Sequence, residues 1–261
     1  MLKKLFRYDF KWLMKTMPYY YIAVLVTAVC ALVTNKTYNA HPAVFGWLIV
    51  DRIFSNLFLA ACFSAGITLI IRCFVRFKNN LFKDEAYLTH TLPVKRSALF
   101  ASKVLSSLAV SVITLAVIAI GVIITISAVK NFRWFTDLIR TETVLLGAVL
   151  IEEILALLLC IFTGTVIGER CSRNKTLKGV LAAVGIYLAV ALFVLSGIGV
   201  LYLISPDIGK LFTEDLRNAD YESLWGILKQ LAACCALMYA VADAVVYLIG
   251  NKLLGKGVNI D

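Results

Sequence analysis

Four long stretches of this sequence contain no charged residue at all. They are 20, 19, 26 and 28 residues long, and they cover Thr16–Asn35, Ile53–Ile71, Val104–Val129 and Gly179–Pro206. A helix of about 20 apolar residues crosses the roughly 30 Å hydrocarbon layer of a bilayer, in which every backbone amide must be bonded within its own segment. The sequence therefore predicts four membrane-spanning helices.

Two further apolar stretches are interrupted by acidic residues, Glu152 and Glu153 in one and Asp243 in the other. An acidic residue near the centre of a span costs about 2.5–3.5 kcal/mol on insertion scales, which the surrounding apolar residues can offset. We therefore expect an all-α integral membrane protein with six transmembrane helices in a single domain, 1–261. The spans are predicted at about 17–35, 53–75, 99–129, 143–168, 179–205 and 228–250.

Composition argues against several other classes of protein. The chain is 61% hydrophobic and 16% charged, whereas about 25% of residues are charged in a typical soluble domain. Its net charge of +10 is scattered between apolar segments, so we expect no nucleic-acid partner. His41 and His90 lie far apart and the spans hold no Ser/His pair, so we expect no metal site, no catalytic residues and no enzymatic activity.

The basic residues predict the orientation of the chain. With the N-terminus inside, 18 Lys and Arg residues fall in cytoplasmic segments and 8 in outer segments. Positively charged residues near span ends are enriched on the cytoplasmic side. Both termini are therefore expected in the cytoplasm.

Residues 1–16 form a separate amphipathic element. Its apolar residues share one helical face, and its basic residues recur every fourth position on another. The basic set is Lys3, Arg7, Lys11 and Lys15. We expect an interfacial helix that anchors to anionic membrane lipid. A cleaved signal peptide is the alternative, but no convincing small-residue cleavage site follows.

The predicted inner loop at 77–97 is the most informative polar segment. Asp84 and Glu85 suit the N-terminus of a short helix, and Pro93 ends it. Tyr87, Leu88 and their apolar neighbours give this loop a partly apolar surface. Such a helix can dock into a groove of another protein, and the alternative is a solvated connector.

Residues 84–96 read Asp-Glu-Ala-Tyr-Leu-Thr-His-Thr-Leu-Pro-Val-Lys-Arg. This segment resembles the DE-x-Y-L-x-x-T-L-P-V-x-R loop of small six-span permeases in bacterial type-2 ABC exporters. The resemblance implies a coupling helix seated in a separate cytoplasmic ATPase, a second permease copy or close paralogue, and a place in the bacterial plasma membrane. The implied ATPase-coupling residues are Asp84, Glu85, Tyr87, Leu88, Thr89, Leu92 and Pro93.

ATP is not expected to bind to this chain itself. No GxxxxGK[ST] sequence occurs, because Gly209-Lys210 precedes Leu211 and Gly255-Lys256 precedes Gly257. That motif supplies the backbone amides and the lysine that hold phosphates. We therefore expect no cofactor here, with ATP and Mg²⁺ bound by the partner ATPase.

The intramembrane acids form a second candidate site. Adjacent helical positions point about 100° apart, so Glu152 and Glu153 can hardly both face lipid. They can line a substrate path, pair with Arg140 or Arg52, or stay protonated and fix helix packing. Asp243 has the same alternatives.

These features favour a permease subunit of an ATP-driven exporter that moves a hydrophobic or amphipathic substrate, with a peptide as first choice. In the resembled family, the segment corresponding to 206–227 helps close an outer gate. Two alternatives remain open. One is a proton- or ion-coupled secondary carrier that uses the intramembrane acids, and the other is a membrane anchor or sensor that docks a cytoplasmic partner.

Overall fold

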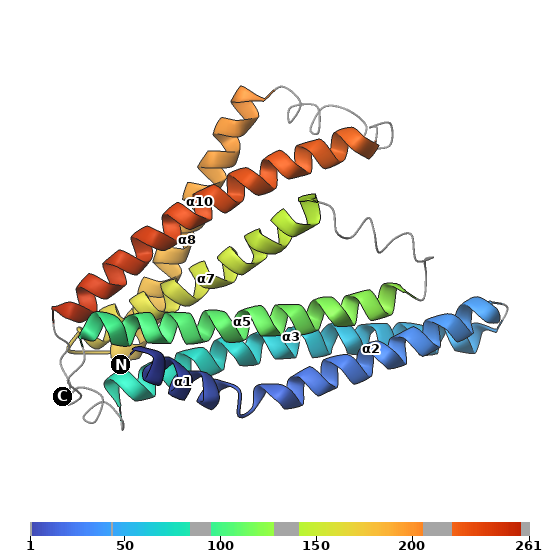
Figure 1. Ribbon diagram of the computed structural model, residues 1–261, viewed down its shortest axis with the longest axis horizontal. Coiled ribbons are helices and arrows are strands. Elements are labelled where there is room, and N and C mark those ends of the chain that lie inside the picture. The colour runs from blue at the N-terminus through green and yellow to red at the C-terminus, as the bar shows by residue number, and fades with distance from the viewer. Residues whose placement is uncertain (1, 43, 84–94, 128–140, 206–220, 257–261) are drawn as a thin grey trace. The chain divides into compact units, whose positions relative to one another are not determined.

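The computed structural model describes residues 2–42, 44–83, 95–127, 141–205 and 221–256, and within them the regular elements are all helices, joined by short turns, without strands (Figure 1). The helices are α1 (Leu2–Leu13), α2 (Met17–Ala40), α3 (Phe45–Phe82), α5 (Arg96–Ile126), α7 (Thr141–Glu169), α8 (Lys175–Ile204) and α10 (Tyr221–Gly255). Six of them, all but α1, are long and apolar enough to cross a membrane. The predicted all-α, six-span membrane protein is confirmed.

Several helices extend well beyond the predicted spans. Helix α3 has 38 residues and α10 has 35, which correspond to roughly 57 Å and 52 Å against about 30 Å of hydrocarbon. Helical backbone bonding needs no lipid, so these helices continue into polar surroundings. Helix α3 therefore includes residues 77–82, which the sequence had assigned to the inner loop.

The chain falls into two compact units. Unit 1 contains α1, α2, α3 up to Asn79 and α5 from Ala101. Its core is built from small residues of α2 and both small and aromatic residues of α3: Val24, Ala28, Ala31, Phe58 and Ala65. Helices pack closely in lipid where such small side chains meet. A bond of 2.8 Å between the hydroxyls of Tyr21 and Thr114 joins α2 to α5.

Unit 2 contains α7, α8, α10, the C-terminal end of α3 and the N-terminal end of α5. Helices α7 and α8 approach each other through small residues. A Cβ added to Gly164 would lie 2.6 Å from the Cβ of Ala183, and one on Gly168 would meet Gly179 at a similar distance. The backbones of α7 and α8 are therefore in contact at these glycines.

Asn174 precedes α8 with φ of 55°. This is a left-handed conformation that asparagine tolerates better than most residues.

The surface carries large apolar side chains along the helices. Leu203 is 82% exposed, Ile204 73% and Phe45 72%. Side chains of this kind gain nothing from water but are at home in hydrocarbon. The exposure agrees with a multi-pass membrane protein whose solvent is lipid.

The α7–α8 contact provides a matched pair of substitutions. Gly164→Ala should destabilise the protein by about 1–3 kcal/mol, because overpacking forces the helices apart. Gly185→Ala, with no atom within 4 Å of its new Cβ, should be neutral or slightly stabilising because alanine favours helix. Thermal unfolding of the purified variants in detergent measures both effects. Equal midpoints for the two variants would contradict the packing described here.

Candidate functional site

Helix α1 separates its charged and apolar side chains as the sequence indicates. The basic residues Lys3, Arg7, Lys11 and Lys15 are all exposed. On the apolar face, Leu13 is fully buried and Leu5, Phe6 and Phe10 are half-buried. The exposed charges are free to meet lipid headgroups, and that contact stays a prediction.

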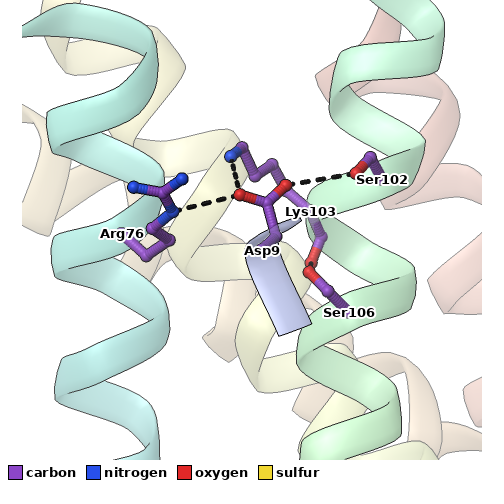
Figure 2. Close-up of polar contacts among 5 residues, drawn as sticks. All are labelled: Asp9, Arg76, Ser102, Lys103 and Ser106. Carbon is purple, nitrogen blue, oxygen red and sulfur yellow. Dashed lines mark hydrogen bonds and ion pairs between the residues drawn. The ribbon is translucent and has the colours of Figure 1, made fainter. Parts of the chain in front are cut away.

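The carboxylate of Asp9 is the centre of a buried ionic cluster (Figure 2). Its Oδ1 accepts hydrogen bonds from Arg76 Nε at 3.0 Å and from Lys103 Nζ at 2.5 Å. Its Oδ2 accepts from the Ser102 hydroxyl at 3.1 Å. Asp9, Arg76 and Lys103 are only 2%, 3% and 4% exposed. We call these four residues the Asp9 cluster.

Aromatic residues of α1 complete the surroundings of Arg76. Its guanidinium carbon lies 4.9 Å from the ring centre of Tyr8 and 5.2 Å from that of Trp12. Arg72 also lies over Trp12, at 5.1 Å. Each such cation–π contact contributes about 0.5–2 kcal/mol, most where water is excluded. Helix α1 thus holds α3 through rings on either side of Asp9 as well as through the carboxylate.

The Asp9 carboxylate is shared by two cations. It bonds to both Arg76 and Lys103 away from water. Removing one partner of a buried ion pair costs about 3–5 kcal/mol. Here the loss of Asp9 would remove a bonded partner from both cations at once.

Two residues of the Asp9 cluster flank the predicted coupling segment in sequence, Arg76 before it and Lys103 after it. Arg76 precedes the end of α3 by six residues, and Lys103 follows the start of α5 by seven, roughly 9–11 Å along each helix. The coupling residues themselves lie outside the described residues: Asp84, Glu85, Tyr87, Leu88, Thr89, Leu92 and Pro93. Asp9 therefore bonds to the helix that enters this segment and to the helix that leaves it.

A second contact, within unit 2, joins the start of α5, just after the predicted coupling segment, to the end of α10. Arg96, the first residue of α5, donates from Nη1 to the carbonyl oxygen of Gly255 at 3.3 Å. Gly255 is the last residue of α10. The start of α5 is thereby bonded to the end of the final helix.

The intramembrane acids occupy unit 2, on α7 and α10. Asp243 is 6% exposed, and neither of its carboxylate oxygens has a hydrogen-bond partner among the described residues. Glu152 is half-buried, its Oε2 is also unpartnered, and it lies within electrostatic range of Asp243. Glu153 instead lies near Tyr239. The structure thus brings Glu152 within electrostatic range of Asp243, and Tyr239 lies near both Glu153 and Asp243.

Neither arginine that the sequence suggested as a partner of Glu152 and Glu153 is seen bonded to them in the described residues. Arg52 is exposed on α3, and Arg140 lies outside the described residues. No group of three or more His, Cys, Asp or Glu side chains that could hold a metal occurs in the described part of the chain. Glu152 on α7 and Asp243 on α10 are a pair of carboxyls within electrostatic range of each other.

Sequence reasoning missed the Asp9 cluster. It used Arg76 and Lys103 only to orient the chain and gave Asp9 no role. The available signal was one acid in a helix otherwise rich in basic residues, since such an acid tends to be buried against cations. It also missed Asp51 of α3, which is 6% exposed with Oδ1 unpartnered among the described residues.

No family model, curated protein or solved structure matches the chain. Functional inference therefore rests on the residues and contacts given above.

The Asp9 cluster predicts a stability effect. Asp9→Asn keeps the shape of the side chain but removes its charge, and it should cost about 3–5 kcal/mol. The thermal unfolding midpoint of the purified protein measures this loss, and limited trypsin digestion should show faster cleavage within α1. Asp9→Asn combined with Lys103→Met should recover part of the stability, because it also removes a buried cation that has lost its bond to Asp9.

Lys11→Gln is the matched control for the Asp9 variant. It removes a charge from the same helix at an exposed position, where a substitution typically changes stability by less than about 0.5 kcal/mol. If Asp9→Asn is as stable as Lys11→Gln, the cluster does not hold α1 in place.

Proposed function

We propose that this chain is the membrane-spanning permease subunit of an ATP-driven exporter, coupled through residues 84–93 to a separate cytoplasmic ATPase. Support comes from the six apolar helices, from the resemblance of the 84–96 segment and from the contacts that flank it. The observation that carries most weight is Asp9, which bonds to the helices on both sides of that segment. A segment that only turned the chain would have no need of such bracing.

The contacts suit a mechanical role. A helix transmits displacement along its length because its backbone bonds resist bending, and packed interfaces move between discrete arrangements. With α3 and α5 fixed to α1 by Asp9, a push on the coupling segment moves these three helices together. ATP binding and hydrolysis in the ATPase then supply the differential affinity that shifts the permease between inward and outward access.

The remaining parts of the proposal follow from the resemblance and the charge distribution. Two permease copies, or this chain and a close paralogue, surround the substrate path in the bacterial plasma membrane, with their termini in the cytoplasm. ATP and Mg²⁺ bind to the ATPase. The segment 206–227 helps close the outer side. The substrate is hydrophobic or amphipathic, with a peptide as first choice.

One observation favours a second candidate function, a proton-coupled secondary carrier. Asp243 is buried without a partner among the described residues, and buried carboxyls form proton relays in carriers. Transport that persists without the ATPase and stops when the proton gradient is removed would identify a carrier. The flanking contacts around 84–93 are unexplained in that case, so we place the exporter first.

Docking of the ATPase predicts the effect of two substitutions. Tyr87→Ala and Leu88→Asp should release the ATPase, because they remove an apolar surface from the coupling segment or place a charge in it. The protein itself should remain folded. Co-purification of a co-expressed cytoplasmic ATPase subunit, with a thermal unfolding midpoint as a check on folding, measures both outcomes. Arg173→Ala, an exposed change in the other predicted inner loop, is the control, and release by Arg173→Ala alone would contradict the assignment.

The proposed orientation can be tested with cysteine labelling. In a variant lacking the seven native cysteines, Thr89→Cys should react with a membrane-impermeant thiol reagent in inside-out vesicles but not in intact cells. Ser127→Cys, beside the outer end of α5, should show the reverse pattern. Labelling of position 89 from outside would end the case for a cytoplasmic ATPase at this segment.

A further inference from the structure

Helices α7 and α10 run parallel with a consistent register. The hydroxyl of Thr163 donates to the carbonyl oxygen of Val246 at 3.5 Å, and the same hydroxyl lies 2.6 Å from a Cβ added to Gly250. The electrostatic pairs of Cys160 with Asp243 and of Glu153 with Tyr239 follow nearly the same offset along the chain. This register places Asp243 level with about residue 160 of α7, away from the ends of both helices.

The surroundings of Asp243 are acidic or weakly polar. The titratable groups near it are Cys160 and Glu152 from α7 and Tyr239 from α10, with Tyr187 of α8 near Tyr239. From the register, Glu152 lies roughly 10 Å nearer the outer end. Within the described residues, neither Asp243 oxygen meets a lysine or arginine.

A purely structural role does not account for Asp243. A buried carboxyl that fixes packing donates a hydrogen bond to a carbonyl or hydroxyl, or it accepts one from a neighbour. Asp243 is only 6% exposed, yet both of its carboxylate oxygens lack such a partner among the described residues. An ionised carboxylate in this position carries a desolvation cost of several kcal/mol. The carboxyl is therefore suited to bind a positive charge that comes from outside the chain.

We propose that Asp243, with Glu152 on its outer side, is a binding site for one positive charge. At rest, Asp243 carries a proton. When the cationic group of a hydrophobic substrate arrives, the carboxyl releases the proton to water and pairs with the cation, so the charge of the site is unchanged. The two carboxyls give this site a preference for cations over anions. The assignment of this cation as substrate rests on the proposed transport function, and it narrows the substrate class to hydrophobic cations or peptides bearing a basic group.

The test uses tetraphenylphosphonium, a hydrophobic monovalent cation, and the purified full-length chain in non-ionic detergent without any ATPase. Equilibrium binding should exceed that of tetraphenylborate, which has nearly the same shape and the opposite charge. As pH falls through the range in which Asp243 is protonated, the Kd should rise about tenfold per unit, because one proton competes for the site. About one proton should be released for each cation bound, which a weakly buffered solution reports directly.

Three variants separate the site from general effects of charge. Asp243→Asn should weaken binding at pH 8 by at least about tenfold and abolish proton release. Glu152→Gln should weaken binding by a smaller factor and leave proton release intact, because the proton resides on Asp243. Glu153→Gln is the matched control, since it removes the same charge one position along α7, whereas Glu152 is the glutamate that acts on Asp243. Its binding should equal that of the unmodified chain.

The outcomes decide the proposal independently of ATPase docking. Cation binding no tighter than that of tetraphenylborate, or binding without proton release, overturns it. Unchanged binding in Asp243→Asn also overturns it. If Asp243→Asn does not fold, the comparison of Glu152→Gln with Glu153→Gln and the proton release of the unmodified chain still decide. Failure of the ATPase to co-purify would leave these measurements unaffected and would count against the exporter alone.

Discussion

The bonds between one carboxylate and two buried cations hold α1, α3 and α5 of unit 1 together. Without Asp9, helix α1 would be attached to α3 and α5 by aromatic contacts and a few apolar side chains. Arg76 and Lys103 would each lose their bond to this carboxylate. Because a low-dielectric environment strengthens the attraction between opposite charges, Asp9 contributes strongly to holding these helices together. The proposed transmission of movement depends on this attachment.

Two aspartates in this protein are buried to nearly the same extent in opposite surroundings. Asp9 is 2% exposed with three donors on its oxygens, whereas Asp243 is 6% exposed with none among the described residues. The first has its charge compensated by the chain itself, so it serves structure. The second has no such compensation, so its charge state depends on a proton or a ligand. Burial alone would have classified them together, and the partners distinguish them.

The six spans could be predicted from sequence because the thickness of hydrocarbon sets a minimum apolar length, and charge-free windows report that length. The ends of α3 could not, because a helix continues into polar surroundings without any change that hydropathy detects. The Asp9 cluster was also beyond sequence reasoning, since Arg76 and Lys103 lie 67 and 94 positions from Asp9 and only tertiary packing joins them. For Glu152 and Asp243, the sequence indicated candidate residues but not their proximity or their lack of partners. The predicted coupling helix lies outside the described residues.

A physical route connects the coupling segment with the proposed cation site inside unit 2. Arg96, which follows the predicted coupling segment, bonds to Gly255 at the end of α10. Asp243 lies twelve residues earlier on α10, roughly 18 Å away along the helix axis. A rigid displacement of α10 would therefore reach the carboxyl without any intervening loop. If docking or ATP binding moves Arg96 and thereby changes the affinity of Asp243 for a cation, linkage requires that the cation change the affinity of the permease for the ATPase by the same factor. In the proposed exporter, stimulation by cargo would then need no separate sensor, because the proposed cation site lies on the helix that is bonded to Arg96.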